Sequence, residues 1–278
     1  MARVRYSFGS RHTGKIGNIR KQREKFPAIV KKVIEVSDIL LEVLDIRFIN
    51  ETRNKDIEDL IKSLNKKIIY VLNKSDLVDE KKTILPKDLR PFVFISAKTG
   101  KGASNLRTKI KIEAKKIDIL EKKRVQVGII GYPNSGKSSL INLISRKSSA
   151  RTSRQAGFTK GIQKIKLAEN LLLLDTPGVI EEKEYSSEDQ EKFSKDAKVS
   201  ARTYNDIRNP EEVIAYLMKE HSKEIEEFYD IKADEDSEVL IEELGKRKKF
   251  LLKGGEIDID RSSRLILKDW QEGKIKIK

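Results

Sequence analysis

The chain lacks cysteine altogether and has only two histidines, two methionines and one tryptophan among its 278 residues. The absence of cysteine excludes disulfide bonds and thiolate metal sites, and two histidines leave little material for a zinc centre. Any bound metal must therefore be held by oxygen. No apolar run approaches the roughly 20 residues that span a bilayer, and the N-terminus lacks the apolar segment of a secretory signal. We expect a soluble, cytoplasmic monomer with no membrane partner.

Positive charge is in excess and unevenly distributed. The formal net charge is +15, from 59 Lys and Arg against 44 Asp and Glu. Residues 1–34 hold ten basic side chains and one acidic one, so residues 1–36 are expected to form a basic N-terminal arm. Localised positive charge favours a polyphosphate partner such as RNA, because cationic side chains release counterions from phosphates. A solvated tail is the alternative interpretation.

Strand and helix patterns alternate through the first two thirds of the chain. Short apolar runs rich in Ile, Val, Leu and Phe suit strands that are buried on both faces of a parallel sheet. Helical stretches lie between them, which predicts a doubly wound α/β fold with a mostly parallel sheet. Two later runs, separated by Glu169, predict an antiparallel hairpin that makes the sheet mixed. The expected strands cover 38–45, 67–73, 91–96, 125–131, 162–168 and 170–176, and the expected helices 55–64 and 105–123.

The pattern becomes helical beyond about residue 185, with no strand signal of comparable strength. Pro210 marks a helix start, and Gly254 and Gly255 are expected to close another helix. The chain therefore divides into the arm (1–36), an α/β domain (37–185) and a C-terminal all-helical domain (186–278). The expected helices of the last part cover 188–204, 209–231, 237–250 and 260–273.

The stretch GYPNSGKSS, residues 131–139, matches the phosphate-binding pattern G-x-x-x-x-G-K-[ST] after a strand and before a helix. Its glycines allow backbone N–H groups to surround phosphates, and the lysine reaches the β and γ phosphates. The hydroxyl after the lysine supplies a ligand for Mg²⁺. The predicted binding residues of this loop are Asn134, Ser135, Gly136, Lys137, Ser138 and Ser139.

The stretch DTPG, residues 175–178, supplies what the phosphate loop lacks. Asp175 at a strand end is placed to hold the shell of the Mg²⁺ ion, and the Gly178 N–H can reach a γ phosphate. Thr159, between the loop and this strand, is the natural second hydroxyl ligand. We therefore predict a magnesium site made by Ser138, Thr159 and Asp175, with Lys137 and Gly178 as catalytic groups.

The stretch NKSD, residues 73–76, follows an apolar strand and indicates guanine recognition. The Asp76 carboxylate accepts from the ring N–H and the exocyclic amino group of guanine, a pairing that adenine cannot satisfy. Asn73 is expected to brace the loops, and the stem of Lys74 to lie along the purine face. The stretch SAKTG ends the next strand, and the Ala97 N–H is expected to contact the guanine oxygen. Ser96 and Lys98 complete the predicted base-binding set.

These five segments resemble the motif set of GTPases in rotated order. GTPases run phosphate loop, threonine switch, DxxG, NKxD and SAK, whereas this chain begins with NKSD and SAKTG. It therefore resembles a circularly permuted GTPase, in which the 105–123 helix joins the ordinary ends. The segments SDILLEVLDIRF, GYPNSGKSSLIN, DIRNPEEVIAYLMKEH and KKFLLKGGEIDIDRSSRLILKDWQEGK are similar to the ribosome biogenesis GTPase A (YlqF) family.

The resemblance implies a protein that hydrolyses GTP to GDP, assists assembly of the large ribosomal subunit, and docks its helical domain on ribosomal RNA. Val179 stands where many GTPases have the glutamine that orients water, so slow intrinsic hydrolysis is expected unless the ribosome completes the site. Family likeness also implies that Asn134 binds K⁺, and that His12 is a candidate catalytic residue.

Other features of the chain have open interpretations. Lys246–Lys249 form a basic run that is either a solvated helix end or a second RNA-binding site. Trp270 is expected in the core, and His221 on the surface. The alternative function is a nucleotide-dependent regulatory switch acting on a protein or membrane partner. The basic arm favours RNA over lipid because it lacks the apolar face of an interfacial helix. A GTPase acting on transfer RNA is a third possibility, but the tail shows no evident modification chemistry.

Overall fold

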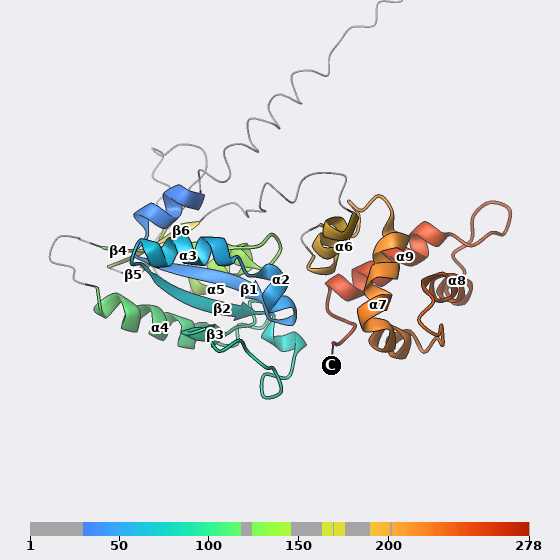
Figure 1. The fold of residues 1–278 in the computed structure, drawn as a ribbon, viewed down its shortest axis with the longest axis horizontal. Helices are drawn as coiled ribbons and strands as arrows, with labels where there is room; N and C mark the ends of the chain where they lie inside the picture. Colours follow the sequence, from blue (N-terminus) through green and yellow to red (C-terminus); the bar gives the residue numbers. More distant parts are fainter. Residues whose placement is uncertain are drawn as a thin grey trace, which may run out of the picture.

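The computed structural model describes residues 30–117, 124–145, 163–168, 170–175, 190–200 and 202–277. These residues form a sheet flanked by helices and, beside it, a group of helices from the C-terminal part of the chain (Figure 1). None of the helices in these ranges has the length and apolar character that crossing a membrane requires.

The sheet has six strands in the order β3-β2-β1-β4-β6-β5. All neighbouring pairs are parallel except β5 and β6, which form the predicted antiparallel hairpin. The central strand β1 is buried along its whole length, as its unbroken apolar run predicts. The strands are β1 (Ile39–Asp45), β2 (Lys67–Asn73), β3 (Phe92–Phe94), β4 (Val125–Gly131), β5 (Gln163–Ala168) and β6 (Leu171–Asp175).

Helices cover both faces of this sheet (Figure 1). On one face, Ile61 of α3 packs with Leu40 of β1, together with Ile34 from a helical segment at residues 30–36. On the other face, α4 and α5 pack against the opposite side chains of β1, β2 and β4. The elements between and beside the strands are η1 (Ile46–Phe48), α2 (Ile49–Thr52), α3 (Lys55–Ser63), η2 (Ser75–Leu77), α4 (Ala103–Lys115) and α5 (Lys137–Ser145).

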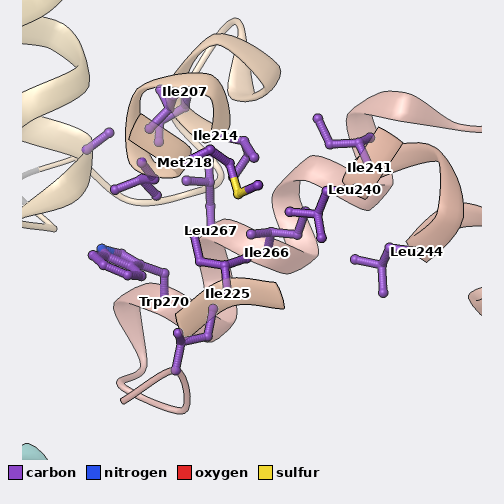
Figure 2. Close-up of a cluster of buried hydrophobic side chains, with 14 of the residues drawn as sticks. Ile207, Ile214, Met218, Ile225, Leu240, Ile241, Leu244, Ile266, Leu267 and Trp270 are labelled. Atoms are coloured by element: carbon purple, nitrogen blue, oxygen red, sulfur yellow. The ribbon is translucent and has the colours of Figure 1, made fainter. Parts of the chain in front are cut away.

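The remaining helices surround a separate apolar core, shown in Figure 2. Pro210 occupies the start of α7, as predicted, and Trp270 is 1% exposed inside this core. Two core members, Phe48 and Tyr132, come from the sheet-containing part, so the two parts pack directly on each other. The helices are α6 (Gln190–Lys198), α7 (Pro210–Tyr229), α8 (Ser237–Lys248) and α9 (Ile259–Gln271).

Several predicted helix ends are wrong. The sequence predicts a helix to residue 123, but α4 ends at Lys115. The backbone N–H of the next residue, Lys116, donates to the carbonyls of Glu113 and Ala114. Helix α6 is followed by Ser200 in a left-handed conformation (φ 64°), which prevents its continuation to residue 204. Helix α8 is closed by Lys249 (φ 56°) rather than by Gly254 and Gly255, which lie further along in the loop.

His221, which was expected on the surface, is only partly exposed, with 14% of its side chain accessible. It lies at a kink in α7, with φ −134° instead of a helical value, and its ring centroid is 4.9 Å from that of Trp270. Burial lowers the pKa of His221, and the nearby Lys198 ammonium lowers it further. The kink turns the imidazole towards the core, which helical spacing alone does not predict.

Candidate functional site

The predicted binding segments meet at one edge of the sheet. NKSD, GYPNSGKSS and DTPG begin at the last residue of β2, β4 and β6, and SAKTG begins after Ile95, the residue that follows β3. These four strands and β1 are parallel, so their carboxyl ends face the same way. In doubly wound sheets, ligands bind outside the carboxyl ends of the strands.

The phosphate loop has the backbone that its glycines predict. Gly131 and Gly136 have φ of 147° and 98°, values that side chains rarely tolerate. A Cβ atom at Gly136 would also clash with the Asn73 amide. Lys137 begins α5 and curls back, and its Nζ donates to the carbonyls of Gly131 (2.9 Å) and Tyr132 (2.7 Å). The loop is therefore closed around its own lysine.

Asn73 joins the base-binding and phosphate-binding segments. Its Nδ2 donates to the Ser135 carbonyl at 2.7 Å, and its Oδ1 accepts from the Ala97 N–H at 3.0 Å. The side chain is 2% exposed, so both bonds are shielded from water. Asn73 therefore links the segment that follows β3 to the phosphate loop by two buried hydrogen bonds. It also brings NKSD beside the loop that contains Lys137.

Other residues of the base-binding set lie around this brace. Asp76 is exposed within η2, and Ala97 and Lys98 follow β3 at the same edge. The Ala97 N–H, which was expected to face the guanine oxygen, donates to Asn73 in this structure. Ser96 is fully buried, and its Oγ accepts from the Thr99 N–H at 3.1 Å, which shapes the SAKTG turn.

Asp45, a residue without a sequence-based assignment, contacts Lys74 of the NKSD segment. It ends β1, is completely buried, and its Oδ2 lies 2.7 Å from the Nζ of Lys74 and 2.7 Å from the Nη2 of Arg47. Burial works to raise the pKa of Asp45, but the hydrogen bonds and charges of Arg47 and Lys74 outweigh it and hold the pKa below its usual value. Burial lowers the pKa of Lys74, and Asp45 opposes that change. Asp45 could have been recognised from the sequence as a carboxylate at the end of an apolar run that is typical of a central parallel strand.

The helical part contacts the phosphate loop. The Tyr132 hydroxyl donates to Asp196 Oδ1 at 2.6 Å, and the Asn134 Nδ2 donates to the Ser200 carbonyl at 2.6 Å. Asn134 is exposed, with φ 55°. The bond uses its amide nitrogen, whereas a potassium ion would need its amide oxygen.

The metal-binding prediction is described only in part. Ser138 is exposed in the first turn of α5, and Asp175 ends β6, which is the parallel neighbour of β4. Hydroxyl and carboxylate oxygens are suitable donors for Mg²⁺, whose shell is usually completed by water and substrate phosphate. Within the described ranges, His, Asp and Glu side chains make no group of three that could hold a metal. Thr159, Gly178 and His12 lie outside the described residues.

Comparison with known proteins agrees with this geometry. The family model described as a 50S ribosome-binding GTPase matches residues 126–248. Ribosome biogenesis GTPase A of Bacillus licheniformis is 31% identical over 91% of this chain and 92% of its own length. The chain belongs to the ribosome biogenesis GTPase A family.

Relatives of this GTPase A family member occur in other organisms. A GTP-binding protein of Methanocaldococcus jannaschii is 38% identical over 92% of this chain and 68% of its own. Nucleolar GTP-binding protein 2 of Saccharomyces cerevisiae is 33% identical over 88% of this chain, which spans about half (51%) of that relative.

A solved relative shows the same fold. YlqF from T. maritima, crystallised with GNP, has a TM-score of 0.63 and 23% identity, over 90% of this chain and 94% of its own. Together with the motif order and the strand order, this match shows that the α/β part is a circularly permuted P-loop GTPase domain.

Proposed function

We propose that this protein binds GTP, hydrolyses it slowly to GDP and phosphate, and uses its nucleotide state to control docking on ribosomal RNA of the large subunit. The observation that carries the proposal is the pair of Asn73 hydrogen bonds, because they hold a guanine-reading segment beside a phosphate loop. In this scheme residues 1–36 are an RNA-contacting arm, 37–185 the GTPase domain and 186–278 the docking domain.

Each protein group then has one task in nucleotide binding. Asp76 accepts from the guanine N–H and amino groups, and Lys137 leaves its loop carbonyls for the β and γ phosphates. The backbone N–H groups from Asn134 to Ser139 surround the phosphates. Bound Mg²⁺ would neutralise developing charge on the phosphate oxygens, with Ser138, Thr159 and Asp175 as its protein ligands.

Loss of the γ phosphate would release Gly178 and Thr159. Asp175 is followed in the chain by the segment that leads to α6, and α6 contributes the Asp196 that bonds the phosphate loop. A change in the switch can therefore reach the helical part through the covalent chain and through the loop contact. This supports coupling between nucleotide state and RNA affinity.

Nucleotide affinity tests the guanine assignment. We expect wild type to bind GTP and GDP far more tightly than ATP, measured by calorimetry with Mg²⁺. Asp76→Asn should lose this preference, because an amide cannot accept two hydrogen bonds from guanine. Equal affinity of the wild type for GTP and ATP would contradict the proposal.

We expect slow GTP hydrolysis by the protein alone, because the Val179 side chain cannot orient the attacking water. We expect faster GTP hydrolysis in K⁺ than in Na⁺, with Asn134 as the ligand, and further stimulation by large ribosomal subunits. Phosphate release should be measured in both salts, with and without subunits. Equal rates under all four conditions would refute this part.

RNA docking is expected to use the basic end of α8. Lys248 and Lys249 are exposed there, whereas Lys246 pairs with Glu243 at 2.8 Å. Replacing Lys248 and Lys249 by Glu should weaken binding of large-subunit rRNA. In a plot of the logarithm of the binding constant against the logarithm of the salt concentration, the slope should become less steep by roughly one unit per lost phosphate contact. Lys67→Glu is the control, because Lys67 is exposed at the start of β2, at the edge of the sheet opposite the candidate nucleotide site. Equal binding by all variants would exclude this surface.

A further inference from the structure

Asp45 binds two cations at the base of the guanine-reading loop. Its carboxylate accepts from the Arg47 backbone N–H (3.1 Å), from Nε (3.0 Å) and from Nη2 (2.7 Å), and it contacts Lys74 Nζ at 2.7 Å. The Asp45 and Arg47 side chains are 0% and 2% exposed, and that of Lys74 is 21% exposed. One carboxylate therefore holds two largely buried positive charges.

Stability alone does not account for this cluster. Taking ions out of water is costly, and packed apolar residues of similar volume often stabilise a protein as well or better. Apart from Glu42 and Asp45, all residues of β1 are apolar. An apolar residue at the end of the strand would therefore fit the pattern of the rest of β1. The cluster instead lies where the purine would bind, because Lys74 belongs to NKSD.

Lys74 is held at both ends. Its backbone is in the left-handed conformation (φ 63°), and its carbonyl accepts from the Leu77 N–H at 3.0 Å. The next residue, Ser75, donates its N–H to the Ile95 carbonyl at 3.0 Å. With Nζ fixed on Asp45, the four-carbon stem between these anchors has little freedom. An immobilised lysine stem is a preformed apolar surface, which lowers the entropy lost when a flat ring binds.

We propose that Asp45 is a positioning residue for the purine: by holding the Lys74 ammonium, it keeps the lysine stem in place to cover one face of the guanine ring. The inference rests on the proposed GTP binding and names a residue that makes it tighter. Asp45 itself touches no part of the nucleotide.

The first test is Asp45→Asn in the full chain. We expect the Kd for GDP and for GTP to rise about tenfold, because the stem must then be ordered during binding. Single-turnover hydrolysis at saturating GTP should keep its wild-type rate, since a loss of uniform binding changes KM and leaves kcat unaltered. A general disturbance of the loops would lower the rate as well, and that result would overturn the positioning role.

A second variant separates the anchor from the stem. Lys74→Met keeps a long hydrocarbon side chain and removes the ammonium, so its GDP affinity should fall about as far as in Asp45→Asn. Combined with Lys74→Met, Asp45→Asn should have little further effect, because no ammonium remains to be held. Additive losses would show that the two residues act independently and would refute the proposal. If Asp45→Asn does not fold, Lys74→Met alone provides the test. The proposal is then refuted if Lys74→Met binds GDP as tightly as the wild type does.

A matched control is available on α4. Glu113 is a largely buried carboxylate paired with Lys116 at 2.9 Å, near the end of α4 that precedes β4 and therefore at the edge of the sheet opposite the site. Glu113→Gln should leave nucleotide affinity unchanged. If wild type bound neither GTP nor GDP, the proposed function would fail. If wild type bound both and Asp45→Asn bound them equally well, only the positioning role would fail.

Discussion

Tyr132 and Asp196 lie 64 residues apart in the chain and share a buried hydrogen bond of 2.6 Å between hydroxyl and carboxylate. Tyr132 belongs to the phosphate loop and Asp196 to α6, so the bond joins the nucleotide site to the helical part. Asp196 is 2% exposed, with Arg202 Nε at 3.7 Å. A displacement of the phosphate loop would therefore be transmitted to α6 through a hydrogen bond that is shielded from water.

Removing this bond should loosen the joint between the two parts. Hydrogen bonds to charged groups contribute about 1.5–3 kcal/mol, so Tyr132→Phe should lower the free energy of unfolding by about that amount. Urea unfolding measures it. In a double-mutant cycle with Asp196→Asn, the combined loss should be smaller than the sum, since both changes remove the same contact. Strict additivity would mean that the bond contributes nothing in solution.

Asn73→Ala should damage both stability and nucleotide binding. The change leaves the Ser135 carbonyl and the Ala97 N–H without their buried partner, at a cost of about 1–3 kcal/mol. Because the two loops then lose their alignment, GDP affinity should fall in calorimetric titration. Asn209→Ala removes an exposed amide bonded to Glu212 and should stay within about 0.5 kcal/mol of wild type. Normal GDP affinity in Asn73→Ala would argue against bracing.

Local patterns were sufficient to predict the strands and the phosphate loop. Apolar runs such as those of β1 and β4 are buried on both faces, and their Ile and Val content suits a pleated sheet. The glycines at 131 and 136 stand where the backbone requires positive φ. Parallel pairing is the expected result of the helical stretches between the strands, and the antiparallel hairpin is the expected result of the short connection between β5 and β6.

Long-range contacts and helix ends could not be predicted in the same way. The end of α8 depends on one left-handed lysine, Lys249, and many residues can adopt that conformation at some cost. The Asp45–Lys74 pair and the packing of α6 on the phosphate loop join segments that are distant in sequence. Neither has a periodic signature, because each depends on how the finished elements meet.

Trp270 should contribute more to stability than any exposed aromatic residue. Its ring contacts Phe48 of the sheet-containing part at 5.9 Å between centroids, and its Nε1 donates to the Lys198 carbonyl at 3.0 Å. Truncating a buried tryptophan costs about 3–5 kcal/mol, so Trp270→Ala should lower the melting temperature strongly in circular dichroism. Phe228→Ala, at a ring that is 41% exposed, should have a much smaller effect. Similar melting of the two variants would contradict the core role.

Glu42 should make the protein less stable as pH rises. This carboxyl group is 1% exposed inside β1, and burial together with the nearby Glu58 raises its pKa to about 8. Its Oε1 accepts from the Asn54 N–H at 3.2 Å. Between about pH 5 and pH 8 the folded state therefore holds a proton that the unfolded state has lost. Under those conditions stability falls with increasing pH, by at most roughly 1.4 kcal/mol per unit.

Glu42→Gln replaces the protonated acid by a neutral side chain of the same shape. The free energy of unfolding of this variant, measured in urea from pH 5 to pH 8.5, should decline less than that of the wild type. The difference between the two curves should grow in favour of the variant as pH rises, because only the wild type has to ionise a buried group. Glu35→Gln, an exposed change, should give a curve parallel to wild type. A parallel curve for Glu42→Gln would show that Glu42 is ionised in the folded protein throughout this range.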